Sequence, residues 1–341
     1  MSAHRDWTEA SMPDQTGRRV LVTGANSGIG LETARMMAAA GAEVILACRN
    51  DDVLGALGEK TTHEAIAAIR AEHPYAAVEA LEVDLASQAS TRLLAQAFHA
   101  RFDRLDVLIN NAGVMWSPES RTTDGFETQL GINHLGHFAL TGLLLPALAR
   151  SPGSRIVAVS SLAHRTASLD LGDLFYRRRA YDPQKAYSQS KVANLLFSRE
   201  LGRRLEAAGM QTLSIAAHPG LSSTGLFASA FPRSRFLGAL FGKGASIVGQ
   251  SAREGALPSV YAATKAGLRN GDYLGPQGLF ELRGHPGEAS SSKLSRDPVP
   301  ARQLWEISEQ LTGVTYAFVA DEGRAPRQAR ASVQAAGDAS A

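Results

Sequence analysis

Residues 19–30 read Arg19-Val20-Leu21-Val22-Thr23-Gly24-Ala25-Asn26-Ser27-Gly28-Ile29-Gly30, an apolar run that leads directly into three closely spaced glycines. The apolar run has the length and composition of a buried strand, and Gly24 ends it. The next segment, Leu31 to Ala40, is rich in Ala and Met and is followed by Gly41, a residue type common just after a helix. We therefore predict a strand, a glycine turn and a helix in that order.

The alternation of apolar runs and helical segments continues along the chain. Glu43 to Cys48 is a second strand candidate, and it completes a βαβ unit of about the ~30 residues that such a crossover needs. The other candidates are strands at 77–83, 105–109, 155–159, 210–216 and, seventh, 272–274, with helices such as 90–102 and 187–208 between them. Such alternation is typical of a parallel sheet covered on both faces. We predict a single α/β domain, a doubly wound Rossmann fold with a mostly parallel seven-stranded sheet.

The length of 341 residues, 44% of them apolar, allows one large domain with a substantial core. We assign residues 1–16 to an N-terminal arm, 17–320 to the domain, and 321–341, which are rich in Arg, Gln, Ala and Ser, to a disordered tail. Within the domain, residues 221–250 mix Phe and Leu with Gly, Ser and Pro and are expected to form a mobile apolar flap. Residues 51–62 are expected to form an extra loop.

Composition excludes several classes of protein. The 35 Lys and Arg residues nearly balance the 33 Asp and Glu residues, so no nucleic-acid partner is indicated. Cys48 is the only cysteine, which excludes an internal disulfide and a Cys-based zinc cluster and fits a reducing compartment. The start of the chain is polar, and no uninterrupted apolar run approaches the ~18 residues of a membrane span. We expect a soluble cytoplasmic protein without a transmembrane segment.

The glycine turn has the properties of a pyrophosphate site. Glycines at 24, 28 and 30 between a strand and a helix let the backbone approach phosphates, whose charge the helix N-terminus favours. The spacing is GxxxGxG rather than the better-known GxGxxG, and the alternative is an ordinary strand-to-helix turn. Arg49 follows the second strand, where an arginine suits the 2′-phosphate of NADP. Asp51 and Asp52 lie nearby, so NAD use stays open, as does a solvated Arg49.

Polar residues also follow the third and fourth strands. Asp84, in Val83-Asp84-Leu85, can accept a hydrogen bond from an adenine amino group, or it can simply cap a helix or turn. Asn110-Asn111-Ala112-Gly113 ends the fourth strand, where amides can fix the turn and small residues leave room for adenosine. A ligand-free Asn-rich turn is the alternative.

Two Tyr and Lys pairs with the same spacing compete for the catalytic position. Tyr187 and Lys191 are four residues apart, and so are Tyr181 and Lys185. Asp182 is a good N-cap and Pro183 a good first helical residue, so only Tyr187 and Lys191 are expected within the helix and on one face. A lysine there can favour ionisation of the phenol, whose ordinary pKa of ~10 is too high for acid-base work near neutrality.

With these motifs the chain resembles the short-chain dehydrogenase/reductase family, from about Arg18 to Gly220 with weaker matches to Gly313. Residues 132–138 (INHLGHF), 159–164 (VSSLAH) and 187–191 (YSQSK) are most similar to the branch that holds retinol dehydrogenases, WW-domain oxidoreductases and many bacterial relatives. The long segment 162–186 between Ser161 and Tyr187 is similar to that branch as well. The extra loop after Arg49 and the Ser222-Ser223 run depart from the family pattern.

The resemblance implies hydride transfer between a nicotinamide and a substrate carbon. Tyr187 is then the acid or base with Lys191, Ser161 positions the substrate oxygen, with Ser160 as its rival, and Asn133 ties a water to the Lys191 ammonium. The cofactor contacts implied are Gly24, Asn26, Ser27, Gly28, Ile29, Gly30, Arg49, Asp84, Leu85, Asn111, Ala112, Gly113, Tyr187, Lys191, Pro219, Gly220 and Thr224.

The expected function is NADP(H)-linked reduction of an apolar ketone or aldehyde, or the reverse oxidation of an alcohol. The alternatives are an NADP-binding sensor or scaffold without turnover and a double-bond reductase on the same fold. His134 and His137 stand three residues apart without a carboxylate partner, so we expect no metal site. The resemblance allows a monomer or a homodimer, and the only expected partner is a small-molecule substrate.

Overall fold

Eight strands form one sheet in the order β3-β2-β1-β4-β5-β6-β7-β8 in the computed structural model, which describes residues 7–221 and 250–318. All neighbouring strands are parallel except β7 and β8, which are antiparallel. The order reverses between β1 and β4, since the chain fills one half of the sheet from β1 to β3 and returns to start the other half at β4. Ligands of such sheets bind at this reversal, outside the carboxyl ends of the strands.

The elements alternate along the chain as follows. The strands are β1 (Arg19–Thr23), β2 (Glu43–Cys48), β3 (Val78–Glu82), β4 (Val107–Asn110), β5 (Arg155–Val159), β6 (Leu213–Ala217), β7 (Tyr273–Pro276) and β8 (Pro286–Glu288). The α-helices are α1 (Gly28–Ala39), α2 (Asp51–Ala56), α3 (Thr62–Glu72), α4 (Gln88–Arg101), α5 (Thr128–Leu130), α6 (His137–Ala149), α7 (Pro183–Ala207), α10 (Ala252–Thr264), α11 (Lys293–Arg296) and α12 (Pro298–Thr312). A π-helical turn, η2 (Gly131–Gly136), joins α5 to α6, and the 3-10 turns are η1 (Glu9–Ser11), η3 (Leu162–Thr166) and η4 (Leu279–Glu281).

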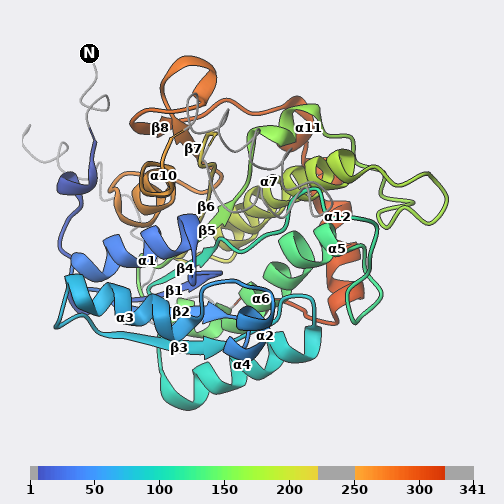
Figure 1. Ribbon diagram of the computed structural model, residues 1–341. Coiled ribbons are helices and arrows are strands. Elements are labelled where there is room, and N and C mark those ends of the chain that lie inside the picture. The colour runs from blue at the N-terminus through green and yellow to red at the C-terminus, as the bar shows by residue number, and fades with distance from the viewer. Residues whose placement is uncertain (1–6, 222–249, 319–341) are drawn as a thin grey trace, which may run out of the picture.

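Helices cover both faces of the sheet because successive strand side chains point to opposite sides. Val20 and Val22 of β1 pack in the core layer that contains α1, α3 and α10, whereas Leu21 packs in the layer that contains α4, α6, α7 and α12. Figure 1 shows α1, α3 and α10 on one side of the strands and α7 and α12 on the other. The doubly wound α/β fold predicted from the alternation is confirmed.

The sheet has one strand more than the seven expected. β8 is the extra strand, and it pairs antiparallel with β7 through Leu274 and Glu288. Its three residues, Pro286–Glu288, include a proline and a glycine, which are poor strand formers. The strand therefore carries no signal in the sequence, and only its pairing with β7 defines it.

The expected loop at 51–62 contains helix α2 and the start of α3. The side chain of Asn50 caps α2 by accepting a hydrogen bond from the Asp52 N–H, and Asp51 and Asp52 lie in the first turn, where negative charge is favoured. Thr61 and Glu64 form a capping box at the start of α3. The sequence did not predict α2 because Gly55, inside the helix, and Gly58, just after it, weaken the helical pattern.

One helical segment, Thr128–Ala149, is long and apolar enough to cross a membrane by length and composition alone. It comprises α5, η2 and α6, and 78% of its most apolar window is buried inside the protein. Polar residues within it, such as Asn133 and His137, are buried and hydrogen bonded. The segment is a core element of the described fold.

Residues near both ends of the described chain pack into the core. Trp7 is buried and its ring meets that of Tyr261 edge to face, with centroids 5.1 Å apart. Val314 and Tyr316 are also buried, beyond the end of α12. The expected tail at 321–341 and nearly all of the expected flap at 221–250 lie outside the described residues.

Glycine at position 30 lets α1 approach the end of β1. A Cβ atom at Gly30 would lie 2.2 Å from the carbonyl oxygen of Gly24 and 2.5 Å from Nδ2 of Asn111. Gly24 and Gly28 have φ angles of +64° and +56°, values that other residue types adopt at a cost. The glycine pattern of residues 24–30 is thus required by the turn itself.

We expect Gly30→Ala to lower the free energy of unfolding by about 1–3 kcal/mol, because backbone atoms must move to admit the methyl group. Gly55→Ala is the matched control, since a Cβ there meets nothing within 4 Å and alanine is the better helix former. Urea unfolding measures both variants. Wild-type stability in Gly30→Ala would contradict the close approach of α1 to the end of β1.

Candidate active site

Helix α7 begins where the sequence predicts. The Asp182 side chain caps it by accepting hydrogen bonds from the N–H groups of Gln184 and Lys185, at 2.9 and 3.1 Å, and Pro183 is the first helical residue. Tyr187 and Lys191 lie inside the helix and Tyr181 precedes it. The side chains of Tyr187 and Lys191 share a face, with the Lys191 Nζ atom 5.7 Å from the Tyr187 ring centroid.

Burial sets the protonation of this pair. Tyr187 is 8% exposed and Lys191 is 4% exposed. Burial raises the pKa of Tyr187 to about 12, against a smaller lowering by its hydrogen bond with Ser161. Burial lowers the pKa of Lys191 to about 8. Burial therefore dominates the pKa of the phenol, and at neutral pH the pair is a neutral phenol beside an ammonium.

The competing pair is occupied elsewhere. The Tyr181 hydroxyl donates to the Ser117 carbonyl at 3.0 Å and accepts from Nε2 of Gln129 at 2.9 Å. The Lys185 side chain is 72% exposed, and its Nζ lies 3.7 Å from Asp182. Neither residue of this pair faces Lys191 or Ser161, so the geometry separates the two pairs as the proline argument predicts.

The two serines after β5 have different surroundings. Ser160 is buried, and its hydroxyl donates to the Lys191 carbonyl at 2.8 Å. Ser161 is the N-cap of η3, where its Oγ accepts from the Ala163 N–H at 3.2 Å, and its side chain also bonds Tyr187. Only the Ser161 hydroxyl therefore lies beside the phenol.

Asn133 lies in the π-helical turn η2 and is fully buried, not on a helix surface. Its Oδ1 accepts from the Val114 N–H at 2.8 Å, and its Nδ2 donates to the Val114 carbonyl at 3.0 Å and to Ser190 at 2.9 Å. The amide thus fixes the segment that follows β4 against α7. Its expected role of holding a water near Lys191 stays a prediction.

Gly113 lies between Asn133 and Lys191. A Cβ atom there would lie 3.0 Å from Asn133 Oδ1 and 3.5 Å from Lys191 Nζ. The absence of a side chain leaves the lysine end of the site accessible from the turn after β4. The predicted Asn110 to Gly113 motif and the Tyr187 helix therefore meet at one place.

Sequence reasoning missed a hub at Thr23, the last residue of β1. Its buried hydroxyl accepts hydrogen bonds from the N–H groups of Asn111 and Ala112, both at 2.9 Å, and lies 2.9 Å from Nε2 of His137. The other ring nitrogen, Nδ1 of His137, lies 3.0 Å from the Asn133 carbonyl oxygen. A threonine directly before the glycine turn was the available signal, but its partners are 88 to 114 positions away.

The start of α1 presents unsatisfied donors. Ser27 is the N-cap of α1, and its side chain makes no capping hydrogen bond. The first-turn N–H groups of the helix therefore remain available to an anion. With Gly24, Gly28 and Gly30 free of side chains, and with Ile29 buried beneath them, the turn fits the pyrophosphate of a dinucleotide. Asn26 points elsewhere, since its Nδ2 donates to the Lys60 carbonyl at 2.9 Å.

Arg49 follows β2 as predicted and is not a free cation. Its Nη2 lies 2.7 Å from Glu59 Oε1, and its side chain is 36% exposed. Asp51 turns its carboxylate toward α3, where it accepts from the Thr62 N–H at 2.6 Å and contacts His63. The segment that runs from β2 into α3 thus supplies both partners, Glu59 for Arg49 and the Thr62 N–H for Asp51.

Asp84 and Leu85 follow β3. One carboxylate oxygen of Asp84 accepts from the Ala86 N–H at 2.9 Å, which is the turn arrangement considered for this residue. The buried Leu85 lies against Gly136, where a Cβ would be 2.7 Å from the Leu85 carbonyl oxygen. Leu85 therefore packs against η2, the turn that carries Asn133.

Pro219 and Gly220 follow β6. Gly220 has a φ angle of +66°, and a Cβ there would lie 2.4 Å from the Leu282 carbonyl oxygen, so the position requires glycine. Nε2 of Gln250 donates to the Pro219 carbonyl at 2.6 Å. Thr224 lies outside the described residues.

The histidines near the site are buried and neutral. Burial lowers the pKa of His134 to about 3 and that of His137 to about 4. Nε2 of His134 contacts the Ser308 hydroxyl at 2.9 Å. Within residues 7–221 and 250–318, no three His, Cys, Asp or Glu side chains lie close enough to hold a metal ion.

A doubly wound sheet, a glycine turn at a helix N-terminus and a phenol beside an ammonium at the same edge are the features of a nicotinamide-dependent oxidoreductase. The chain belongs to the short chain dehydrogenase family, whose model matches residues 18–234. It is therefore an enzyme that acts on an alcohol or a carbonyl group. The resemblance stated from the motifs is confirmed.

Relatives place the chain in the retinol dehydrogenase branch. The chain is 40% identical to human (Homo sapiens) retinol dehydrogenase 12 over 302 residues, 88% of each chain. It is 41% identical to mouse (Mus musculus) polyprenol dehydrogenase over 318 residues, 90% of this chain and 88% of the relative. A crystal structure of an uncharacterised protein from Mycobacterium paratuberculosis is 40% identical with a TM-score of 0.72, and the match covers 91% of this chain and 99% of that one.

Lys191→Met should stabilise the protein at neutral pH. The pKa of Lys191 falls from 10.5 to about 8 on folding, so between these values the unfolded chain binds more protons and stability rises with pH. The cost of burying the charge is fully present below pH 8 and is relieved as the pH approaches 10.5. The variant should therefore exceed wild type by up to about 3 kcal/mol near pH 7, with a difference that vanishes near pH 10.5.

Urea unfolding across this pH range measures the difference. Lys185→Met is the control, because Lys185 is 72% exposed and its removal should give a small difference that does not change with pH. A pH-independent difference for Lys191→Met would contradict the lowered pKa of Lys191.

Proposed function

We propose that this enzyme reduces a ketone or aldehyde on an apolar substrate with NADPH, and that it catalyses the reverse oxidation when the alcohol is abundant. One observation carries the proposal. Against the larger opposite effect of burial, hydrogen bonding with the Ser161 side chain lowers the pKa of the Tyr187 hydroxyl, and the Lys191 Nζ lies 5.7 Å from the Tyr187 ring centroid. This places a proton donor and a second hydroxyl donor where a single carbonyl oxygen can meet both.

The residues divide the work as follows. The bound cofactor supplies the hydride. Ser161 donates a hydrogen bond to the substrate oxygen and orients the carbonyl. Tyr187, neutral because burial raises its pKa to about 12, holds the proton that the same oxygen needs in reduction. The Lys191 ammonium lies where it stabilises the tyrosinate left after that transfer.

The Lys191 side chain is held in place by the end of strand β5. Its Nζ donates to the Val159 carbonyl at 3.1 Å, which leaves two of its three N–H groups for ligands. Asn133 positions the segment after β4 beside the ammonium through Val114. We propose that a water held near Asn133 connects Lys191 to solvent and replaces the proton that Tyr187 gives up.

An apolar substrate fits the relatives. Two of them are named for retinol and for polyprenol, both long hydrocarbon alcohols. The side chains of Tyr187, Lys191 and Asn133 are all buried, and burial away from bulk water strengthens each electrostatic contact. We propose a substrate whose carbonyl or alcohol group ends an apolar chain.

The charges after β2 favour NADP over NAD. Arg49 is the cation that suits a 2′-phosphate, whereas the acidic candidate Asp51 is turned toward Thr62 and His63. Glu59 holds Arg49 in place and repels a phosphate that approaches it. We propose that the 2′-phosphate of NADPH competes with Glu59 for the guanidinium.

The single cysteine, Cys48, is consistent with a reducing compartment. Cys48 is free and buried, and burial raises the pKa of its thiol to about 11. The thiol is therefore protonated near neutral pH and unreactive. We propose the cytoplasm as the compartment, where NADPH drives the reaction toward reduction.

Tyr187→Phe should lower kcat/KM for carbonyl reduction by about a hundredfold to ten-thousandfold. The reason is that Tyr187 is the proposed proton donor and no other described residue next to Ser161 is assigned that role. Tyr181→Phe is the matched control and should retain kcat. NADPH oxidation with a panel of retinal-like and other apolar aldehydes and ketones measures both. Full activity in Tyr187→Phe would show that Tyr187 is not the proton donor. NADPH binding without turnover of any carbonyl would contradict the proposed reaction and favour a sensor.

Cofactor preference should respond oppositely to the two residues of the Arg49 ion pair. Arg49→Gln should weaken NADPH binding about tenfold or more and leave NADH binding nearly unchanged, because only NADPH carries the 2′-phosphate. Glu59→Gln should tighten NADPH binding, since it removes the competing carboxylate. Kd values from cofactor fluorescence measure the preference, and a wild-type preference for NADH would overturn the assignment.

A further inference from the structure

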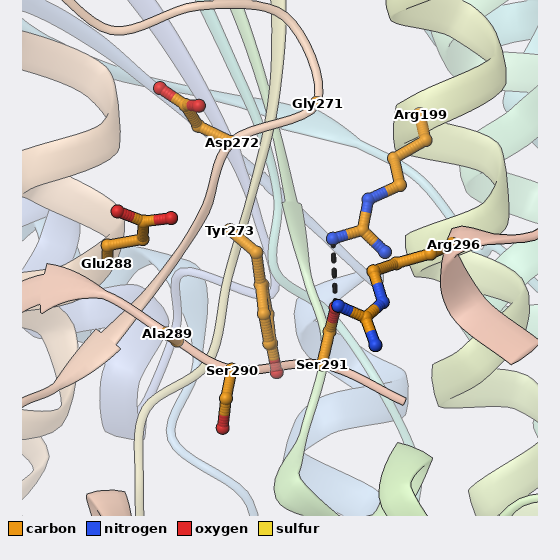
Figure 2. A pocket seen from close by; sticks show the side chains of 9 residues that line it. All are labelled: Arg199, Gly271, Asp272, Tyr273, Glu288, Ala289, Ser290, Ser291 and Arg296. Atoms are coloured by element: carbon orange, nitrogen blue, oxygen red, sulfur yellow. Dashed lines mark hydrogen bonds between the residues drawn. The ribbon is translucent and has the colours of Figure 1, made fainter. Parts of the chain in front are cut away.

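A cavity of about 380 Å³ lies between the end of the sheet and the middle of α7. Its wall includes Arg199 from α7 and Arg296 from α11, and Asp272 and Glu288 from the segments around β7 and β8. Figure 2 shows the two guanidinium groups on one side of Tyr273 and the two carboxylates on the other. The volume is near the lower end of the range for small-ligand sites.

The cavity is separate from the catalytic residues. Arg199 is twelve positions beyond Tyr187 on the same helix, which is about 18 Å at 1.5 Å per residue. None of the residues assigned to hydride transfer or to the dinucleotide lines it. A ligand here would not occupy the position of the substrate carbonyl.

Arg199 is held in place by neutral groups. Its Nη1 donates to the carbonyl and hydroxyl oxygens of Ser295 at 2.7 and 3.1 Å, and its Nη2 donates to the Ser291 hydroxyl at 3.0 Å. Burial, and then the neighbouring positive charge of Arg296, lower the pKa of Arg199. The guanidinium is thus oriented by its protein contacts while its charge is not neutralised by them.

Arg296 extends into the same space. Within the described ranges the side chain of Arg296, an exposed residue, makes no hydrogen bond and no ion pair, and the side chain of Arg199 forms no ion pair there. By contrast, Arg203 and Arg204, one turn further along α7, both form ion pairs with Glu200, at 2.7 and 2.9 Å. Two guanidinium groups facing one cavity without an anion repel each other.

The opposite wall carries the complementary charge. Asp272 accepts a hydrogen bond from the Arg269 N–H at 2.8 Å through one oxygen, and the Glu288 carboxylate has no side-chain partner among the described residues. Neither carboxylate comes within 4.0 Å of either arginine, the limit for an ion pair. The two walls therefore present opposite charges that the protein leaves apart.

We propose that this cavity binds a small zwitterion, a primary amine that carries a phosphate or carboxylate a few bonds away. The anionic group lies between Arg199 and Arg296, where paired guanidinium groups suit a planar or tetrahedral oxyanion. The ammonium faces Asp272 and Glu288. A simple anion satisfies only the arginine wall and is repelled by the carboxylates, whereas a zwitterion satisfies both.

O-Phosphoethanolamine is the probe, with inorganic phosphate and ethanolamine as its two halves. Isothermal titration should show wild type binding the probe at least about tenfold more tightly than phosphate. Arg296→Gln should weaken probe binding about tenfold or more, while Lys293→Gln, an exposed cation on the same helix, should leave it unchanged. Asp272→Asn combined with Glu288→Gln should reduce the preference over phosphate to within about twofold, with Glu306→Gln as its control.

Three outcomes would overturn the proposal. They are no binding of the probe by wild type, equal binding of probe and phosphate, and binding that survives in Arg296→Gln. Co-sedimentation with vesicles of phosphatidylcholine containing phosphatidylethanolamine separates two sources of the same chemistry. Vesicle binding that Arg296→Gln abolishes would support a lipid headgroup, and binding of the soluble probe alone would support a free metabolite. Each readout is independent of oxidoreductase activity, so its failure is distinguishable from failure of the proposed reaction.

Discussion

The hydrogen bonds of one hydroxyl, that of Thr23, join the parts of the site. Thr23 ends β1, accepts the N–H groups of Asn111 and Ala112 after β4, and contacts His137 at the start of α6. With both lone pairs engaged, the hydroxyl donates to Nε2 of His137, and Nδ1 of that ring donates to the Asn133 carbonyl. The low pKa of His137 preserves this neutral tautomer. The glycine turn, the Asn-rich turn and the π-helical turn therefore hold one relative position.

Burial sets the ionisation of Tyr187 and Lys191. Lys191 is buried beneath the turn after β4, where its Nζ donates to the Val159 carbonyl at the end of β5. Burial destabilises its charge and the ionised form of Tyr187 alike. A ligand that brings negative charge to Lys191, or positive charge to Tyr187, regains part of that free energy on binding. The ionisation of this pair therefore depends on the ligand, while the protein alone fixes the positions of the two side chains and buries them.

Local pattern predicted most of the fold because each signal acted over a few residues. The strands at 43–48 and 155–159 and the start of α7 at Pro183 follow from hydrophobic runs and capping residues within one turn of them. Short elements were not predicted, because a few residues carry too little local signal. β8 has three residues and exists only through its pairing with β7, and α2 is a short helix whose glycine weakens the pattern. Tertiary pairing outweighs local propensity in β8, whereas α2 is supported by its local cap at Asn50.

Local sequence patterns were enough to predict the class of fold, the glycine turn and the placement of Tyr187 and Lys191, rather than Tyr181 and Lys185, on one face of a helix. These depend on spacing and on a cap at Asp182, which act through neighbouring residues. Only the tertiary structure distinguished Ser161 from Ser160, paired Arg49 with Glu59 and revealed the role of Thr23. It also placed Arg199 and Arg296 on one side of Tyr273 and Asp272 and Glu288 on the other, all in the wall of one cavity. The physical reason is that hydrogen bonds and charges act through space, between residues that the fold brings together from distant parts of the chain.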